Sequence, residues 1–172
     1  RISKLEKDEL DLEKAAVNLH EIITDAVTHV SLIVENKGGY IKTHFFAENS
    51  NTFGSDFHLT NIIVNIIDNG IKYTEGAPEI DIYTENASNY VVVKVVDKGI
   101  GMSKAVQKKI FEKFYREQMG NIHNVKGHGL GLSYVKKIVE LHRCKIQVES
   151  KKGVGSKFII TIPLKPQHQN AS

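Results

Sequence analysis

The stretch NIIVNIIDNGIKY, residues 61–73, combines three asparagines, one aspartate and one lysine with regularly spaced isoleucines. Asn and Asp are poor helix formers, yet the isoleucines recur at helical intervals. Amide and carboxylate oxygens are hard ligands that suit Mg²⁺, and the ammonium group of Lys72 could balance the charge of a phosphate. A metal–nucleotide site would therefore explain residue types that otherwise only weaken the helix.

This predicted helix has two distinct faces when its residues are placed about 100° apart. The apolar face is formed by Leu59, Ile62, Ile63, Ile66, Ile67, Gly70 and Ile71. The polar face is formed by Asn61, Asn65, Asp68, Asn69 and Lys72. An ordinary solvated face is the alternative, but Glu, Lys, Arg or Gln would serve there with a helix propensity better by roughly 0.3–0.5 kcal/mol per residue.

Two glycine-rich segments could also contact a ligand. DKGIG, residues 97–101, directly follows a β-branched run, so Asp97 could direct its carboxylate into a pocket that the glycines leave open. KGHGLGL, residues 126–132, precedes a predicted helix, whose N-terminal N–H groups favour phosphate. Alone, the first segment is equally consistent with a tight turn and the second with a flexible connection. Neither matches the Rossmann or the P-loop pattern.

Bulk properties allow one domain with a substantial core in 172 residues. Hydrophobic residues make up 41% and charged residues 25%, and a net charge of +3 gives no indication of nucleic-acid binding. Cys144 is the only cysteine, which excludes an internal disulfide. The sequence contains neither a membrane-spanning apolar run nor a signal peptide, and because it begins at Arg1 we expect it to be a fragment of a larger protein.

Hydrophobic periodicity predicts the elements that position these residues. Helices are expected over 18–35, from Asp56 to about Lys72, near 103–109 and over 133–142. Strands are expected over 40–46, around Ile80 and Ile82, and over 91–97, 145–150 and 157–162, with hairpin connections at 85–89 and around KKGVG. Asn18 and Asp56 are the predicted N-caps of the first two helices. This order predicts a helical layer on a mixed or mostly antiparallel sheet.

Taken together, the motifs resemble those of the histidine protein kinases. NIIVNIIDNGIKY is similar to their asparagine box, NLLxNAxKY, and DKGIG is similar to their first glycine box. IFEKFYR, residues 110–116, resembles the aromatic F box, GHGLGL the second glycine box, and GVGS, residues 153–156, the last one. The five motifs occur in the family's order, and the resemblance covers the chain from about residue 15 to 165.

The resemblance implies the Bergerat ATP-binding fold, shared with gyrase-type ATPases and heat-shock chaperones. This is an α/β (α+β) two-layer sandwich, with a mixed, mostly antiparallel sheet of about five strands and three main helices on one face. Residues 15–165 would form the catalytic ATP-binding domain. Residues 1–14 would be the end of a dimerisation helix with its linker, and we expect residues 166–172 to be a disordered tail.

The resemblance also implies roles for individual residues. Asn65 corresponds to the Mg²⁺ ligand, Lys72 to a residue near the phosphates, and Arg116 to a basic residue that reaches the γ-phosphate. Asp97 corresponds to the carboxylate that accepts a hydrogen bond from the adenine amino group. The residues implied to bind ATP are Asn61, Asn65, Asn69, Lys72, Tyr73, Asp97, Gly99, Gly101, Gly127, Gly129, Leu130 and Gly131. Asp68 has no implied contact.

Other residues are better explained by packing. Phe111 and Phe114 belong to the F box, and we favour core packing over ligand contact for both. In the family they anchor the hinge of a lid over ATP, which here would span about residues 115–130. The eight histidines show no metal-ligand spacing, and Cys144 is interpreted as a small apolar residue before a strand.

The phosphoacceptor histidine of the family, in a box like HELRTPL, is absent from this sequence. The resemblance therefore implies the catalytic half of a bacterial sensor histidine kinase, which transfers the γ-phosphoryl group of Mg-ATP to a separate dimerisation domain. The implied partners are that domain and, through it, a response regulator. The whole protein would be a homodimer at the inner membrane, with this domain in the cytoplasm.

Two alternatives remain: a nucleotide sensor without catalysis, and a hydrolysing ATPase of the gyrase type. Hydrolysing relatives carry a glutamate one helical turn before the Mg²⁺ ligand, and Asn61 occupies that position here. An amide has no useful basicity near neutral pH and cannot activate water as a carboxylate does.

Overall fold

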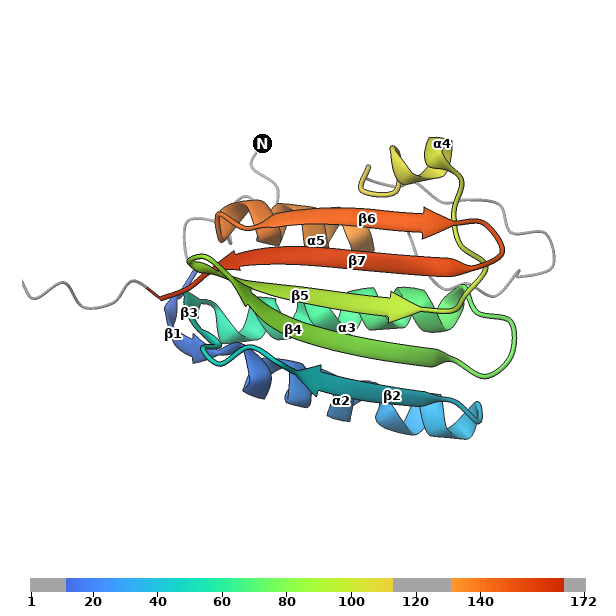
Figure 1. Cartoon of the computed structure of the whole chain (residues 1–172), viewed down its shortest axis with the longest axis horizontal. Coiled ribbons are helices and arrows are strands. Elements are labelled where there is room, and N and C mark those ends of the chain that lie inside the picture. Colours follow the sequence, from blue (N-terminus) through green and yellow to red (C-terminus); the bar gives the residue numbers. More distant parts are fainter. Residues whose placement is uncertain (1–11, 113–130, 166–172) are drawn as a thin grey trace, which may run out of the picture.

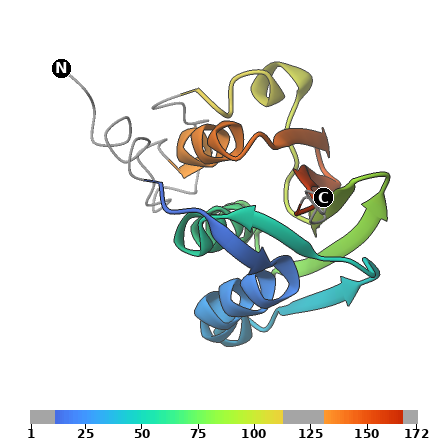
Figure 2. The same cartoon turned by 90° about the vertical axis from the view of Figure 1, so that its left-hand side faces the viewer.

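The structure, a computed structural model, describes residues 12–112 and 131–165. It has two layers, a five-stranded sheet and a layer of helices that covers one of its faces (Figures 1 and 2). The sheet has the order β2-β4-β5-β7-β6, with bounds Tyr40–Phe45, Glu79–Ala87, Tyr90–Asp97, Gly155–Pro163 and Lys145–Lys151. The helices of the second layer are α2 (Leu19–Asn36), α3 (Asp56–Lys72) and α5 (Gly131–Leu141).

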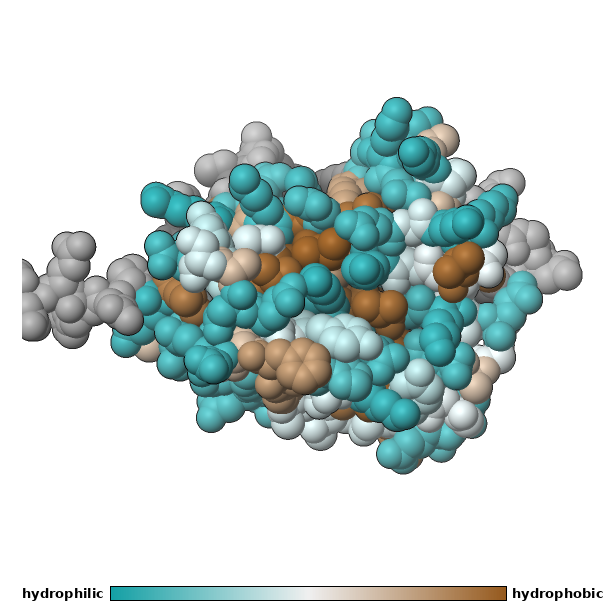
Figure 3. All heavy atoms as spheres, in the orientation of Figure 1, coloured by the Kyte–Doolittle hydropathy of each residue, from teal (hydrophilic) through white to brown (hydrophobic). Residues whose placement is uncertain are grey.

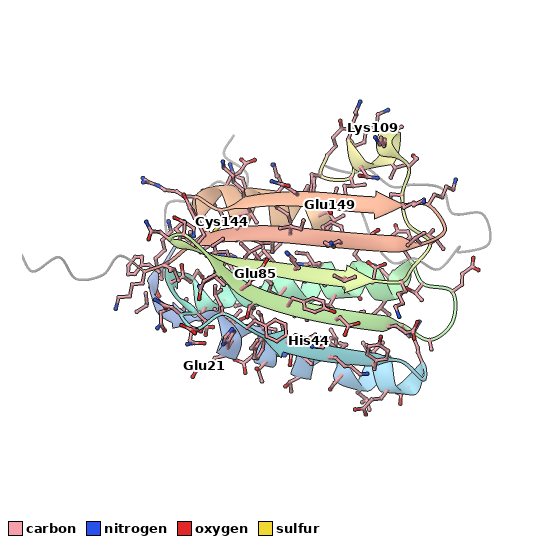
Figure 4. The ribbon with its side chains drawn as sticks, in the orientation of Figure 1. Glu21, His44, Glu85, Lys109, Cys144 and Glu149 are labelled. Carbon is pink, nitrogen blue, oxygen red and sulfur yellow. The ribbon has the colours of Figure 1, made fainter. Side chains whose placement is uncertain are left out.

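The sheet is mixed, as predicted: β2 pairs with β4 in parallel, and the other neighbouring strands pair antiparallel. Alternate residues of the central strand β5, Val91, Val93 and Val95, point to the helices and are almost completely buried. The outward face carries mostly hydrophilic side chains with apolar patches among them (Figure 3). Glu85 and Glu149 are two of these outward residues (Figure 4).

Helix α3 has the two faces predicted from the sequence. All seven residues of the predicted apolar face are buried against the sheet and the neighbouring helices. The five residues of the polar face are half-buried, neither in the core nor fully in solvent. Because this polar face is partly covered, its side chains have less conformational freedom than they would on a fully solvated face.

Two predictions of element boundaries were wrong. Ser55, not Asp56, is the N-cap of α3, because its hydroxyl accepts from the His58 N–H at 3.3 Å. Asp56 lies inside the first turn, where its charge still suits the helix dipole. Strand β4 continues to Ala87, so the hairpin to β5 is tighter than the predicted connection over 85–89. The Asn18 cap of α2 is confirmed.

A small second sheet was not predicted. Strands β1 (Ala15–Asn18) and β3 (Asn51–Gly54) pair antiparallel at the end of the molecule where α3 begins. Neither strand shows a regular alternation of apolar and polar residues in its sequence. In β3 the buried residues are Thr52 and Gly54, and no residue of β1 is buried. The predictions for residues 1–11 and 166–172 lie outside the described residues.

The remaining helix, α4 (Lys104–Gln107), follows the first glycine box and matches the short helix that was predicted there. Cys144 is buried just before β6, which confirms its interpretation as a core residue (Figure 4). Burial raises the pKa of its thiol to about 12, so the side chain is neutral and unreactive at ordinary pH. Phe111 packs edge-on against Phe158 in the core, as favoured from the sequence.

Candidate active site

The carboxylate of Asp97, at the end of β5, is held by backbone groups of the glycine loop that follows it and of the neighbouring strand β7. Its Oδ1 accepts from the N–H of Gly99 at 2.9 Å and from the N–H of Ser156, at the start of β7, at 3.2 Å. The residue is only 8% exposed. Burial raises the pKa of the carboxyl group, and the two hydrogen bonds oppose this shift. Because both donors use Oδ1, the orientation of the carboxylate is fixed.

The other carboxylate oxygen of Asp97 faces helix α3. A β-carbon added at Gly70 would lie 3.4 Å from Asp97 Oδ2, so the absence of a side chain there keeps space beside this oxygen. Thr74, just beyond the helix, donates its hydroxyl to the Gly70 carbonyl at 2.6 Å. The end of α3 and the end of β5 thus form two sides of one small region.

The loop DKGIG packs against the last turn of α3. The N–H of Ile100 donates to the carbonyl of Tyr73 at 3.0 Å, and a β-carbon at Gly99 would lie 2.6 Å from the same oxygen. Gly101 has φ +72° and leaves no room for a side chain against the backbone of Lys151. The glycines therefore permit close packing of backbone on backbone, which holds the loop in one conformation.

On the polar face of α3, the amide of Asn65 also has a fixed orientation. Its Nδ2 donates to the carbonyl of Asn61 at 2.9 Å. Only the nitrogen of an amide can donate, so this bond determines which end is the oxygen. Asn65 Oδ1 faces the first residue of α5, since a β-carbon at Gly131 would lie 3.6 Å from it. A neutral oxygen is thus presented at the start of a helix.

Further along α3, Lys72 pairs with Asp68, with 2.9 Å between Nζ and Oδ2. Asp68 had no contact implied by the sequence, and the structure gives it one. Asn69 and Tyr73 are half-buried beside this pair. The polar face thus carries a cation, held by a neighbouring carboxylate, near the neutral amides.

The structure brings together two groups of predicted residues: Asp97, Gly99, Gly101 and Tyr73 at one end, and Asn61, Asn65 and Gly131 along the helix. Four other predicted residues, Arg116, Gly127, Gly129 and Leu130, lie outside the described residues, as do Phe114 and the whole of the predicted lid. Over 12–112 and 131–165, no group of three or more His, Cys, Asp or Glu side chains is placed to hold a metal ion.

Comparison with known proteins identifies the fold and its family. Residues 54–166 match the family described as "Histidine kinase-, DNA gyrase B-, and HSP90-like ATPase". The chain belongs to this family. The region that matches includes both ends of the site described above.

Relatives of this ATPase domain are bacterial sensor kinases. It is 38% identical over 166 residues to the sensor protein RprX of Bacteroides fragilis, and this alignment covers 95% of this chain and 32% of RprX. It is 30% identical over 170 residues to the sensor histidine kinase YclK of Bacillus subtilis, covering 96% of this chain and 35% of YclK. The chain thus spans about a third of the length of these relatives.

A solved structure of similar size is the catalytic domain of the histidine kinase ThkA. The two chains superpose with a TM-score of 0.74 and 27% identity, covering 90% of this chain and 99% of the ThkA domain. This likeness confirms the predicted fold class, a helical layer on a mixed five-stranded sheet. Within the part of this ATPase domain that the structure describes, no helix is long and apolar enough to cross a membrane.

Sequence reasoning did not assign three residues of the site: Ser156, Thr74 and Gly70. Ser156 acts through its backbone N–H, so its side-chain type gives no signal, although it closes the GVGS motif. Thr74 follows the asparagine box directly, and its hydroxyl bonds within the last turn of α3. Gly70 was assigned to the apolar face, and its position beside Asp97 becomes visible only when β5 is placed against α3.

Proposed function

We propose that this domain binds Mg-ATP and transfers its γ-phosphoryl group to a histidine nitrogen on a dimerisation domain that this chain does not contain. The bond from the γ-phosphorus to the bridging oxygen breaks as the phosphorus–nitrogen bond forms, and ADP is the leaving group. The observation that carries the proposal is the buried carboxylate of Asp97, whose Oδ1 is occupied by two backbone donors. Its Oδ2 can accept a hydrogen bond, and the exocyclic amino group of adenine is a donor of the right kind.

The residues at the phosphate end fit a hard divalent cation. The hydrogen bond from Asn65 Nδ2 to Asn61 directs Asn65 Oδ1 outward to the start of α5, and a neutral oxygen is a suitable ligand for Mg²⁺. When bound, Mg²⁺ would neutralise phosphate charge and orient the phosphates. Asn65 would hold the ion, Lys72 would contact the phosphates, and the backbone from Gly127 to Gly131 and Arg116 would complete the enclosure.

Catalysis by this chain's own residues would consist of positioning and charge neutralisation. Lys72 and Arg116 supply positive charge, and Asp97 fixes the base and so the register of the triphosphate. Asn61 lacks the basicity to take a proton from water, which protects the γ-phosphate from hydrolysis. The nucleophile, and the carboxylate that activates it, would come from the dimerisation domain.

The likeness to the sensor protein RprX and the sensor histidine kinase YclK supports a sensor kinase as the whole protein. It would be a homodimer anchored in the inner membrane of a bacterium, with this domain in the cytoplasm. Its phosphohistidine would pass the phosphoryl group to the receiver domain of a response regulator. The short share of each relative that this chain spans accords with a separate phosphoacceptor domain.

The proposal is tested with γ-labelled ATP, Mg²⁺ and a separately expressed dimerisation domain from the same protein. We expect acid-labile phosphohistidine on that domain, very little free phosphate, and no label on this chain. Hydrolysis at several turnovers per second without label transfer would support the gyrase-type ATPase instead. Tight binding of ATP with neither transfer nor hydrolysis would support the sensor without catalysis.

A further inference from the structure

His142, directly after α5, is buried and makes two hydrogen bonds that fix its tautomer. Its Nε2 accepts from the backbone N–H of Ser55 at 2.9 Å, and its Nδ1 lies 2.8 Å from the carbonyl of Ile138. An amide N–H can only donate and a carbonyl can only accept. The ring must therefore carry its proton on Nδ1 and none on Nε2. The sequence gave no indication of this role, because His142 shows no metal-ligand spacing to the other histidines.

The ring approaches the backbone so closely because residue 54 is a glycine. A β-carbon at Gly54 would lie 2.8 Å from His142 Cδ2 and 3.0 Å from Nε2. Ser55, the residue that donates to the ring, is also the N-cap of α3. His142 thus joins the end of α5 to the start of α3 by a specific, space-limited contact.

A second polar contact joins the same two helices. His58 Nδ1 lies 2.7 Å from the hydroxyl of Tyr134, one helix carrying each side chain. The helices then continue to the phosphate end of the candidate site, where Gly131 of α5 lies beside Asn65 of α3. Any shift of α3 against α5 at the His142 end would change the spacing between Asn65 and the start of α5.

We propose that His142 and Gly54, called here the α3–α5 clip, position the two helices so that Asn65 and the N-terminus of α5 lie at the right separation to bind one Mg-nucleotide. His142 is a positioning residue, since it acts through the helices and does not touch the ligand. This inference rests on the proposed nucleotide binding. It assigns a function to a histidine at the end of the domain opposite the glycine loops.

The clip should respond to acid. If Nε2 took a proton, it would become a donor and could no longer accept the hydrogen bond from the Ser55 N–H. Burial lowers the pKa of His142 below its ordinary 6.5; the bond to Ile138 opposes this shift, and the charges of Lys14 and His58 add to it. The group is therefore neutral and the clip intact above pH 6.5. As the pH falls through the lowered value, the ring takes a proton, the bond to Ser55 is lost, and nucleotide affinity should fall.

Three variants test the clip by calorimetric titration of Mg-ATP between pH 5 and pH 8. His142→Ala leaves the buried Ser55 N–H without an acceptor and should weaken binding by about tenfold at pH 7.5. Gly54→Ala, which displaces the ring without removing it, should weaken binding similarly. His142→Gln can both donate and accept, so it should bind within about twofold of the unmodified domain and lose the decline in affinity at acid pH.

His20→Gln is the matched control, because burial also lowers the pKa of His20, whose ring bonds to Thr84 and stacks on Phe45. It should keep the decline at acid pH. Affinities are compared as ratios to the unmodified domain at each pH, which cancels the titration of the nucleotide phosphates. The clip is refuted if folded His142→Ala binds normally, or if His142→Gln retains the acid decline.

Amide hydrogen exchange without nucleotide separates failure of the clip from failure of the proposed function. In His142→Ala, exchange should accelerate both near Ser55 and at the distant Asn65 and Gly131 segments, and His142→Gln should restore all three. Acceleration confined to the residues next to Ser55 would show a local packing role and overturn the inference. If the unmodified domain bound no nucleotide, the proposed function would fail, while the exchange pattern would still decide whether the clip positions the helices.

Discussion

The two ends of the candidate site are built differently. At the base end, Asp97 is 8% exposed and is fixed by the backbone donors of Gly99, in the glycine loop, and of Ser156, in β7. At the phosphate end, the described groups are side chains on one half-buried helix face, oriented by bonds within that helix. The base end therefore depends on the sheet, the glycine loop and the end of α3, whereas the phosphate end depends on how α3 and α5 lie together.

From this difference we expect the two ends to contribute separately to the proposed function. A rigid, buried acceptor can select a base but does no chemistry on the phosphates. Half-buried amides and a paired lysine are suited to contact a triphosphate and its cation. Substitutions at the base end should thus change affinity for every adenine ligand alike, and those at the phosphate end should change only what depends on Mg²⁺ and phosphates.

The largest effect is expected for Asn65→Ala at the phosphate end. Loss of the oriented oxygen should reduce phosphotransfer to the separate dimerisation domain by about a hundredfold or more, because metal-assisted charge stabilisation supplies several kcal/mol. The Mg²⁺-dependent part of ATP affinity should disappear, while adenosine binds as before. Single-turnover labelling measures the rate, and titrations with and without Mg²⁺ measure the affinity.

Asn36→Ala is the matched control, since Asn36 is an exposed residue at the end of α2. It should leave both measurements unchanged. Should Asn65→Ala keep its full Mg²⁺ dependence, the assignment of the polar face as the metal side of the site would be wrong at its centre.

At the base end, Asp97→Ala should weaken ATP, ADP and adenosine similarly. A hydrogen bond to a charged group contributes about 1.5–3 kcal/mol, which corresponds to about ten- to a hundredfold in affinity. GTP should bind poorly even to the unmodified domain, because guanine presents a carbonyl where adenine presents an amino group. Asp81→Ala, which removes a carboxylate bonded to His44 on the outward sheet face, is the control. Equal affinities for ATP and GTP would contradict the role of Asp97.

Residue type and spacing were sufficient to select Asn65 and Asp97 as candidate site residues, and their roles stay predictions. A helix repeats every few residues, so its polar face can be derived from a short stretch, and a strand end before glycines is equally local. Ser156 and His142 could not be predicted in this way. The bond from Ser156 to Asp97 spans 59 positions and the bond from Ser55 to His142 spans 87, and both use backbone donors. Contacts that depend on backbone groups of distant segments leave no pattern in side-chain types.

The same reasoning applies to the fold. The five strands of the main sheet and the helices α2, α3 and α5 follow from hydrophobic periodicity over their own lengths. Strands β1 and β3 do not, because each has only four residues and little buried surface. Their pairing depends on the positions of α2 and α3, which the sequence pattern does not specify.

A smaller effect is expected at the base end, where replacing Asp97 should change the free energy of unfolding. Asp97→Asn keeps an oxygen for both backbone donors but removes the cost of a buried charge, so it should raise the free energy of unfolding near pH 7 while weakening nucleotide binding. Burial raises the pKa of Asp97 above its ordinary 3.8. The destabilising charge is present above the raised value and is lost as the pH falls through it. Urea unfolding between pH 7 and pH 4 should therefore show the two proteins converging at acid pH; a difference that is constant with pH would contradict this origin.

The smallest effect is expected at the pair formed by Asp68 and Lys72. To contact a phosphate, Lys72 must give up part of its interaction with Asp68, and the carboxylate itself repels the triphosphate. Both side chains are partly exposed, at 39% and 30%, so the pair is screened by solvent. Pairs four residues apart on an exposed helix face contribute only about 0.3–0.5 kcal/mol. Asp68→Ala should therefore strengthen ATP binding by about twofold at low salt.

Three features make this last expectation testable despite its size. The gain should vanish at high ionic strength, and adenosine, which has no phosphate, should show none. Glu85→Ala, which breaks the 2.7 Å pair of Lys94 and Glu85 on the outward sheet face, should leave ATP affinity unchanged (Figure 4). If Asp68→Ala weakened ATP binding instead, the carboxylate would be holding Lys72 in its working position. The phosphate end would then be preorganised by side-chain pairing, as the base end is by its backbone.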